Sequence, residues 1–222
     1  MFLPRPIREL TLCYVTDRKG LAATADEQIR LLLQKIEEAA RAGMDWIQIR
    51  EKDLNGRELG ELVREARRRA PVGCRILVND RLDVGCTTGA DGVHLGEQSL
   101  PVADVKRFLR EQKRGLDFLV GASRHSPDAA LEAQRAGADY VIFGPVFATP
   151  SKAPYAAPQG VPRLAQVCEK LTIPVMAIGG ITLANARECL HAGAAGIAAI
   201  RLFQDAEDVA AVVHALRSQR RR

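Results

Sequence analysis

The chain has 222 residues, of which 47% are hydrophobic and 27% charged, and its formal net charge is +5. This length suits one domain with a sizeable core, and no apolar stretch is long enough to span a bilayer. Aromatic residues make up only 5%, so the basic surplus lacks the interleaved aromatic side chains of a nucleic-acid-binding surface. We therefore expect no nucleic-acid and no membrane partner, and a modest attraction for small phosphorylated molecules.

The two chain ends and the cysteines bear on location. Residues 1–9 lack the apolar stretch and the cleavage site of a secretory signal, so we interpret them as an N-terminal extension. The basic runs Arg64–Arg69 and Arg217–Arg222 are interpreted as a solvated helix face and a chain end, with residues 218–222 as a basic tail. The five cysteines form no CxxC pair, which argues against a disulfide framework and a zinc site. We expect a cytoplasmic protein.

In chain order, short apolar runs alternate with segments of helical periodicity. Eight runs are apolar on both faces, as buried parallel strands are: Thr11–Val15, Trp46–Ile49, Ile76–Val78, Gly92–Leu95, Phe118–Gly121, Tyr140–Phe143, Pro174–Ile178 and Gly196–Ile200. Seven helices are expected between and after them, with a short eighth within Arg81–Thr88: Asp26–Arg41, Arg57–Arg69, Val102–Arg110, Ser126–Ala136, Val161–Leu171, Leu183–Ala192 and Asp205–Arg217.

A recurring glycine segment organises this alternation. Its copies begin at Ala42, Thr88, Ala136 and Ala192, and each closes a helical pattern and opens an apolar run. The glycine is typical of the left-handed residue just past a helix. Successive glycines are 46, 48 and 56 residues apart, and two strand–helix units of about 20–25 residues fit each interval. The repeat predicts an α/β chain folded as one (β/α)8 TIM barrel over residues 1–222. An open doubly wound sheet is the alternative, but the expected GxGxxG turn is absent.

Polar side chains follow the second expected strand. Gln48, Arg50 and Lys52 alternate onto one side at its end. In such a barrel the active site lies at the carboxyl ends of the strands. A guanidinium and an ammonium there suit phosphate oxygens, by a bidentate and a point contact respectively. A solvated strand end with surface charges remains the alternative.

Further polar residues follow strands three to five. They are Asn79 and Asp80 after strand three, His94 in strand four, and Ser123 and His125 at the end of strand five. Singly, Asp80 could cap the next helix, and either histidine could be structural. Their common position at one rim of the barrel favours a functional site.

The longest connection, residues 144–160, follows strand six. Loops of this length are often functional, and Thr149, Ser151 and Lys152 offer two hydroxyl groups and an ammonium to a polyanion. After strand seven, Gly179-Gly180 precede an expected helix, where backbone N–H groups can hold a phosphate. A tight turn is the alternative for the two glycines alone.

These residues resemble the thiamine-phosphate synthase family and its relative, the thiazole tautomerase. The segments that carry the resemblance are Tyr14–Arg18, Gln48–Lys52, Asn79–Asp83, Gly89–Gly96, Gly137–Tyr140, Gly144–Phe147 and Ala177–Ile181. The resemblance implies a transferase of thiamine biosynthesis that joins a hydroxymethylpyrimidine diphosphate to a thiazole phosphate and releases pyrophosphate. The implied chemistry is dissociative: the diphosphate leaves first, and the thiazole nitrogen captures the pyrimidine cation.

The resemblance also implies residue roles. The diphosphate would be cradled by Gln48, Arg50, Lys52, Asn79 and Lys152. Asp80 would bind one Mg²⁺ per subunit. Ser123 would lie beside the pyrimidine and the diphosphate. Thr149 and Ser151 would contact the thiazole phosphate, with backbone contacts from Gly180. A homo-oligomer is compatible with the sequence, which does not specify the oligomeric state.

Three positions depart from the family pattern. Ser99 stands where a second Mg²⁺-binding aspartate is usual, so Glu97 or water would have to replace that ligand. Arg124 stands where a threonine is usual. After strand eight, Ile200 and Arg201 begin a segment that replaces the small residues that help to hold the phosphate.

These departures keep two other functions open. A thiazole tautomerase would need no metal and would use His125. The synthase is favoured, because a diphosphate needs more positive charge, by the joint presence of Gln48, Arg50, Lys52, Asn79, Asp80 and Thr149–Lys152. A non-catalytic barrel that binds thiamine phosphate is the third hypothesis.

Overall fold

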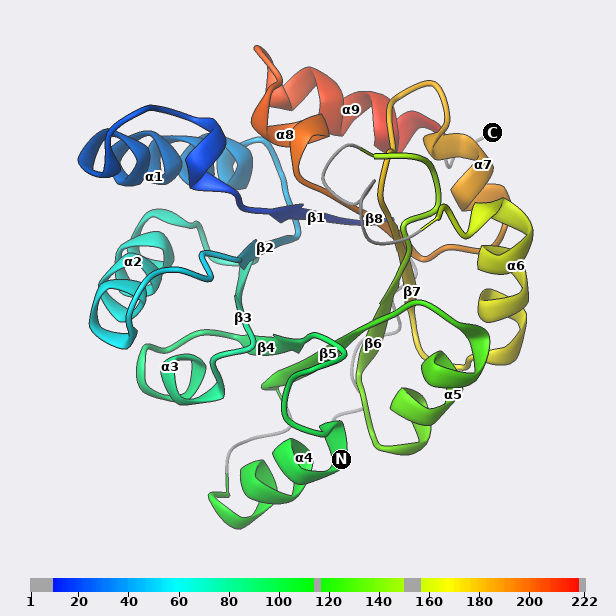
Figure 1. Cartoon of the computed structure of the whole chain (residues 1–222). Coiled ribbons are helices and arrows are strands. Elements are labelled where there is room, and N and C mark those ends of the chain that lie inside the picture. The colour runs from blue at the N-terminus through cyan, green and yellow to red at the C-terminus, as the bar shows by residue number, and fades with distance from the viewer. Residues whose placement is uncertain (1–9, 114–116, 150–156, 220–222) are drawn as a thin grey trace.

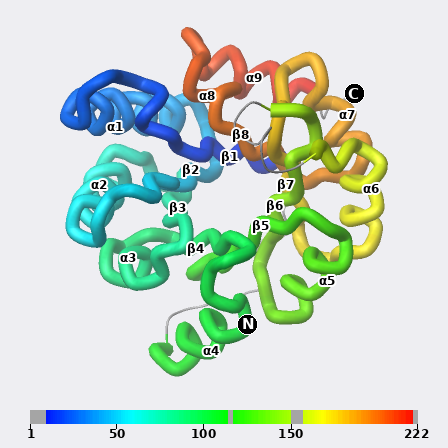
Figure 2. The backbone as a smooth tube through the Cα atoms, in the orientation of Figure 1, coloured from blue at the N-terminus to red at the C-terminus, as the bar shows by residue number. Residues whose placement is uncertain are grey.

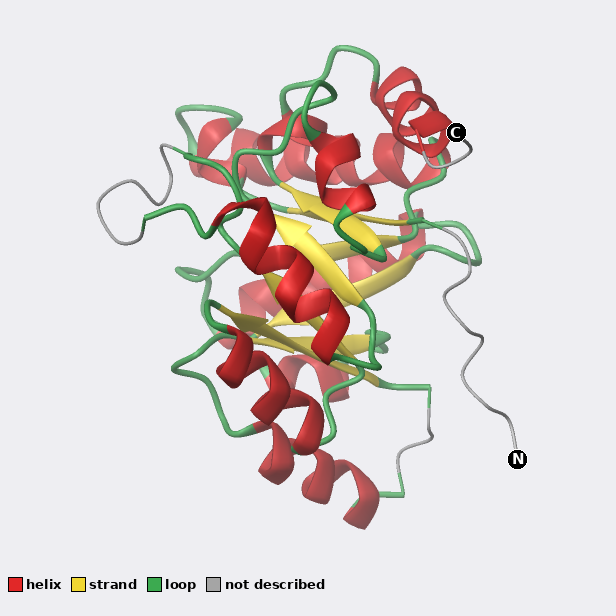
Figure 3. Cartoon of the chain, turned by 90° about the vertical axis from the view of Figure 1, so that its right-hand side faces the viewer, coloured by secondary structure: helices red, strands yellow, loops and turns green. Residues whose placement is uncertain are grey.

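The computed structural model describes residues 10–113, 117–149 and 157–219. Eight parallel strands form a closed barrel in chain order, and the last strand pairs with the first. The strands form the inner ring and the helices surround it (Figure 1). The tube in Figure 2 passes once around this ring, and in side view the helices run alongside the strands (Figure 3). The (β/α)8 barrel expected from the glycine repeat is confirmed.

The elements alternate as the periodicity predicts. The strands are β1 Thr11–Val15, β2 Trp46–Ile49, β3 Arg75–Asn79, β4 Gly92–Leu95, β5 Leu119–Arg124, β6 Tyr140–Phe143, β7 Val175–Ile178 and β8 Gly196–Ala199. The α-helices are α1 Ala25–Arg41, α2 Gly56–Arg69, α3 Leu82–Thr87, α4 Val102–Glu111, α5 Pro127–Arg135, α6 Gly160–Lys170, α7 Ala186–His191, α8 Arg201–Gln204 and α9 Val209–Gln219, with a 3-10 turn η1 at Arg18–Gly20. No helix among the described residues is long and apolar enough to cross a membrane.

Two helix predictions are wrong in their starts. The helix expected from Leu183 begins at Ala186, because Asn185 closes a turn instead: its Oδ1 accepts the Thr182 N–H at 2.8 Å and its Nδ2 donates to the Gly180 carbonyl at 3.0 Å. The helix expected over 205–217 begins only at Val209, as α9, and the short helix α8 lies before the expected range.

The expected basic tail is also partly wrong. Ser218 and Gln219 continue α9, and the Gln219 amide donates to the Leu183 carbonyl at 2.8 Å. Arg217 does not belong to a loose chain end, because its guanidinium donates to the carbonyls of Leu10 and Gly43 at 2.8 and 2.7 Å. The rest of the tail and the N-terminal extension lie outside the described residues.

The repeat explains how each even-numbered strand is entered. Gly43, Gly89, Gly137 and Gly193 have φ values of 90°, 74°, 95° and 95°, so the left-handed conformation expected past the helices is confirmed. In three copies the residue two positions later is an aspartate whose carboxylate accepts an N–H from the strand before it. These bonds run from Leu12 to Asp45 (2.7 Å), from Ile76 to Asp91 (2.8 Å) and from Val120 to Asp139 (2.6 Å).

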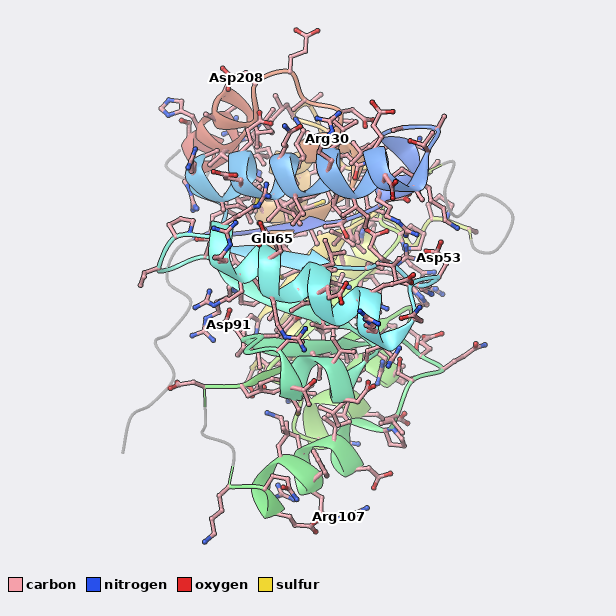
Figure 4. All side chains as sticks on the ribbon, turned by 90° about the vertical axis from the view of Figure 1, so that its left-hand side faces the viewer. Arg30, Asp53, Glu65, Asp91, Arg107 and Asp208 are labelled. Carbon is pink, nitrogen blue, oxygen red and sulfur yellow. The ribbon has the colours of Figure 1, made fainter. Side chains whose placement is uncertain are left out.

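Each of these carboxylates also has a cationic partner. The pairs are Asp45–Arg217 at 3.0 Å, Asp91–Arg67 at 3.3 Å and Asp139–Lys106 at 2.6 Å. The fourth copy has Ala195, whose backbone N–H donates to the Val175 carbonyl at 2.8 Å. Asp91 precedes a strand and Asp53 follows one, and they lie at opposite ends of the barrel (Figure 4). The repeated aspartates therefore stabilise the end remote from the strand termini that carry the site.

The core has two parts. A large apolar cluster fills the space between strands and helices. A smaller one fills the barrel and includes Trp46, Leu77, Tyr140 and Met176. Further along β2 and β3, the inward positions change from Trp46 and Leu77 to Gln48 and Asn79, because alternate residues of a strand share one face. The interior is thus apolar in its middle and polar toward the carboxyl ends.

Candidate active site

The segment after β2 alternates positive and negative side chains. Arg18, only 5% exposed, binds the two negative ones: its Nη1 donates to Glu51 at 2.9 Å and to Asp53 at 2.7 Å, and its Nη2 donates to Asp53 at 2.8 Å. The hydrogen bonds from Arg18 hold the pKa of Asp53 well below its ordinary value. Among the described residues, no carboxylate lies within ion-pair distance of the side chains of Arg50 or Lys52. Both cations therefore remain available to a bound anion.

Thr16 fixes the backbone of this segment. Its buried hydroxyl donates to Glu51 Oε1 at 2.6 Å and accepts the N–H of Arg50 at 2.9 Å. The end of β1 thereby holds the start of the cationic segment in place. Sequence reasoning placed no role on Thr16, Arg18 or Glu51. The sequence signal for them was the alternation of Arg50 and Lys52 with Glu51 and Asp53. If the two cations are to stay free, the two acids need another positive partner.

A hydrogen-bonded relay joins the ends of β2 and β3. Gln48 Nε2 donates to Asn79 Oδ1 at 2.9 Å, and Asn79 Nδ2 donates to Asp80 Oδ2 at 2.6 Å. Asp80 sets the direction, because a carboxylate can only accept. The remaining oxygen of Gln48, Oε1, is buried without a hydrogen-bond partner among the described residues. Gln48 therefore offers an acceptor, which suits an N–H group better than a phosphate oxygen.

Asp80 joins the ends of β3 and β4. Its Oδ1 accepts the Gly96 N–H at 3.0 Å and the hydroxyl of Ser99. Its φ is 61°, in the left-handed region that few residues other than glycine adopt. Burial alone would raise the pKa of Asp80, but hydrogen bonds from Ser99 and Gly96 and the charge of Lys52 outweigh burial and lower it. The group is therefore a carboxylate at neutral pH.

Asp80 was the expected Mg²⁺ ligand, and Ser99 occupies the position of the family's second ligand. Among the described residues, no group of three or more His, Cys, Asp or Glu side chains could hold a metal, and Glu97 is exposed. Mg²⁺ in phosphate-transfer sites uses one or two carboxylates together with substrate phosphates and water. One ionised carboxylate beside a hydroxyl and near Lys52 fits such an ion, with fewer protein ligands than a pair of aspartates would give.

A second hydrogen-bonded relay joins side chains of β4, β5 and β6. His94, 1% exposed, contacts the Tyr140 hydroxyl through Nδ1 at 3.1 Å and Ser123 Oγ through Nε2 at 2.8 Å. Burial lowers the pKa of His94 to about 3, with Asp80 opposing and Arg124 and Arg50 reinforcing the shift. The imidazole is neutral at physiological pH.

Strand β5 is longer than expected, so Ser123 and Arg124 lie within it.

Arg124 lies beside this relay. Its Nη1 donates to the Ser123 carbonyl at 2.6 Å. Burial lowers the pKa of its guanidinium, and Glu97 and Glu132 oppose that shift. The residue that departs from the family pattern thus contacts the backbone of a predicted site residue.

The chain after β6 runs along the end of β7. The N–H groups of Val146 and Phe147 donate to the carbonyls of Ile178 and Gly179 at 2.8 and 3.0 Å. Gly180, at φ 64°, has no room for a side chain, because a Cβ would lie 2.4 Å from the Ala148 carbonyl oxygen. Thr149 follows Ala148 directly, so the backbone of Gly180 lies against the segment that leads into Thr149.

Other predicted residues of this loop differ in outcome. His125 Nδ1 bonds to the Gly144 carbonyl and so ties β5 to the loop. Ser151 and Lys152 lie outside the described residues. The helix start expected directly behind Gly179-Gly180 is wrong, since α7 begins at Ala186.

The end of β8 leads into the short helix α8. Ile200 precedes it, and Arg201 is its first residue and exposed. Gln204, 6% exposed, secures α8 against β1: its Oε1 accepts the Tyr14 hydroxyl at 2.9 Å, and its Nε2 donates to the Asp17 carbonyl at 2.9 Å. A short extra helix near the ends of strands seven and eight is a frequent phosphate site of this fold.

Comparison with known proteins identifies the family. Residues 14–203 match the family model described as thiamine monophosphate synthase. The chain is 44% identical over 193 residues to the putative thiamine-phosphate synthase of Geobacter sulfurreducens, covering 86% of this chain and 85% of that one. It is 41% identical over 186 residues to the thiamine-phosphate synthase of Chloroflexus aurantiacus, covering 82% of each.

Solved structures agree. The thiamine phosphate pyrophosphorylase of Pyrococcus furiosus superposes with a TM-score of 0.81 at 34% identity over 97% of both chains. A 3-hexulose-6-phosphate synthase, at 17% identity and a TM-score of 0.68, shares the fold alone. The matched residues span the strand ends that form the site, from Thr16 to Arg201. This chain belongs to the thiamine monophosphate synthase family.

Proposed function

We propose that this chain is a thiamine-phosphate synthase, joining a hydroxymethylpyrimidine diphosphate to a thiazole phosphate with release of pyrophosphate. The observation that carries the proposal is the pair Arg50 and Lys52. These two cations at the rim have no carboxylate partner among the described residues, Lys52 acts on the charge of Asp80, and Arg18 holds the neighbouring acids. Such a site suits a substrate of high negative charge.

The two bonds that change involve one carbon. The bond between the pyrimidine methylene carbon and the diphosphate oxygen breaks, and its electron pair leaves with the diphosphate. The thiazole nitrogen then donates its lone pair to the methylene carbon. Arg50 and Lys52 stabilise the charge that develops on the leaving group. Ser123 lies beside the reacting centre, and Lys152 and Asn79 complete the diphosphate site.

Gln48 takes a different role from the one expected. Its free Oε1 accepts the exocyclic N–H of the aminopyrimidine, because its own N–H is committed to Asn79. Thr149, Ser151 and the backbone of Gly180 hold the thiazole phosphate, and Ile200 and Arg201 border it. Arg201 adds a positive charge to that phosphate site.

One Mg²⁺ is proposed per subunit, held by Asp80 with Ser99 beside it. When bound, the ion neutralises charge on the diphosphate. The protein's own part is to keep Asp80 ionised, which the donors Ser99 and Gly96 ensure. The cytoplasm is the proposed compartment, because the five cysteines are free thiols.

The test is release of pyrophosphate by the purified protein from the two substrates, with and without Mg²⁺. We expect release that depends on both substrates and on the metal, and formation of thiamine phosphate. Arg50→Ala should lower turnover by orders of magnitude, whereas Arg57→Ala, an exposed arginine on α2, is the matched control. Isomerisation of the thiazole carboxylate phosphate without pyrophosphate release would instead indicate the tautomerase. Binding of thiamine phosphate without either reaction would indicate the non-catalytic barrel.

A further inference from the structure

Three neighbouring strands carry His94, Gly121 and Tyr140 at one level of the barrel. In the strand register, His94 lies opposite Gly121, and Gly121 lies opposite Tyr140. A Cβ on Gly121 would lie 2.0 Å from Cζ and 2.3 Å from the hydroxyl oxygen of Tyr140. The missing side chain therefore lets the Tyr140 ring cross β5, and its hydroxyl reaches His94 Nδ1 at 3.1 Å. Trp46 packs on the same ring, with centroids 4.6 Å apart.

The surroundings of Tyr140 set the direction of this hydrogen bond. The residue is 1% exposed, and among the described residues His94 is the only hydrogen-bond partner of its hydroxyl group. A buried O–H group must donate to an acceptor, so it donates to Nδ1, which can accept only if that nitrogen carries no proton. A neutral imidazole carries one N–H. That N–H is then on Nε2, and it donates to Ser123 Oγ at 2.8 Å.

We propose that Tyr140 and His94 are positioning residues that fix Ser123 as a hydrogen-bond donor to the substrate diphosphate. Because Ser123 Oγ accepts a hydrogen bond from His94, the hydroxyl hydrogen of Ser123 is not donated to the imidazole and can be donated to an anionic oxygen. The opposite direction, with Ser123 donating to His94, would present only lone pairs to a diphosphate. The proposal rests on the proposed function only for the identity of the anion.

The direction can be measured without any substrate. Long-range ¹H–¹⁵N correlation spectra distinguish the two neutral tautomers of histidine, and the chain has four histidines, so the His94→Gln spectrum identifies the His94 signals. We expect the Nε2–H tautomer between pH 6 and pH 8, and a shift away from it in Tyr140→Phe. A Nδ1–H tautomer or an imidazolium in the wild type would overturn the proposal, whether or not the protein has synthase activity.

Turnover provides the second test. His94→Met removes both hydrogen bonds at similar volume, and we expect kcat to fall roughly 100- to 1,000-fold, the range for loss of one oriented donor, with KM for the thiazole phosphate unchanged. His94→Gln keeps an amide N–H within reach of Ser123 and should recover most of this loss. Ile142→Val, in the same apolar layer, is the packing control and should stay within twofold of wild type.

A double-mutant cycle separates positioning from packing. In a Ser123→Ala background, His94→Met should cost less than about twofold more, because the group that it orients is already gone. Additive losses in the cycle, or equal losses in His94→Gln and His94→Met with intact circular dichroism, would refute the relay. Absence of pyrophosphate release in the wild type would refute the proposed function alone, since the tautomer measurement still decides the relay.

Discussion

Asp139→Ala tests the view that the repeated aspartates stabilise the barrel at the end remote from the site. The carboxylate accepts the Val120 N–H at 2.6 Å, and Val120 is fully buried. Its removal leaves a strand N–H without a partner, which costs about 1–3 kcal/mol. The ion pair with Lys106 is partly exposed and adds no more than about 1 kcal/mol. The free energy of unfolding should fall by about 1–4 kcal/mol, and Tm by about 2–16 °C for a chain of this size.

Urea unfolding followed by circular dichroism measures this loss. Asp139→Asn keeps an acceptor for Val120 and should lose roughly 1 kcal/mol, because only the charge is removed. Ala195→Asp places a carboxylate opposite Val175 in the copy that lacks one, and should gain up to about 1 kcal/mol. Turnover at 25 °C should not change in any of the three. If Asp139→Ala stays within about 0.5 kcal/mol of wild type, or if the Ala and Asn variants lose equally, the backbone hydrogen bond is not the source of the stability.

Three further predictions concern the site. Arg18→Met leaves the buried carboxylate of Glu51 without its cation. The free energy of unfolding should therefore fall by about 3 kcal/mol or more, and calorimetry should show weaker binding of pyrophosphate. Wild-type stability and wild-type pyrophosphate affinity in Arg18→Lys would refute the role of the guanidinium fork. Ser99→Asp adds a carboxylate beside Asp80 and should lower the Mg²⁺ concentration for half-maximal turnover about tenfold; an unchanged requirement would place the ion elsewhere. The pKa of His94 falls from 6.5 to about 3 on folding, so below pH 6.5 the unfolded chain binds a proton that the folded chain does not. Its contribution should weaken by about 1.4 kcal/mol per pH unit from pH 6 to pH 4, and equal pH slopes in wild type and His94→Gln would contradict this.

The barrel was predictable because its signals are local. Each of the four glycines follows a helix whose end it caps, and each apolar run is a strand buried on both faces. The rim was predictable for the same reason, since the carboxyl ends of parallel strands meet at one end of a barrel. Gln48, Asn79 and Asp80, which come from two strands, are joined by hydrogen bonds as this reasoning requires.

The connections between side chains were not predictable from spacing. Arg18 meets Glu51 only because β1 and β2 pair, and Tyr140 meets His94 only because Gly121 leaves room on the strand between them. The start of α7 was missed because Asn185 bonds to Thr182 and Gly180 and so competes with the helix. In each case a long-range or side-chain contact outweighs the local pattern.

The seam between β1 and β8 has a consequence for folding during synthesis. Tyr14 bonds to Gln204 across 190 residues of sequence, and the Leu10 carbonyl bonds to Arg217 across 207. Neither bond can form until synthesis has passed Gln204 and Arg217 respectively. The first strands therefore emerge from the ribosome long before β8 exists, and one edge of β1 stays open until β8 has been made. Closure of the barrel is therefore expected only after β8 and α9 have been made.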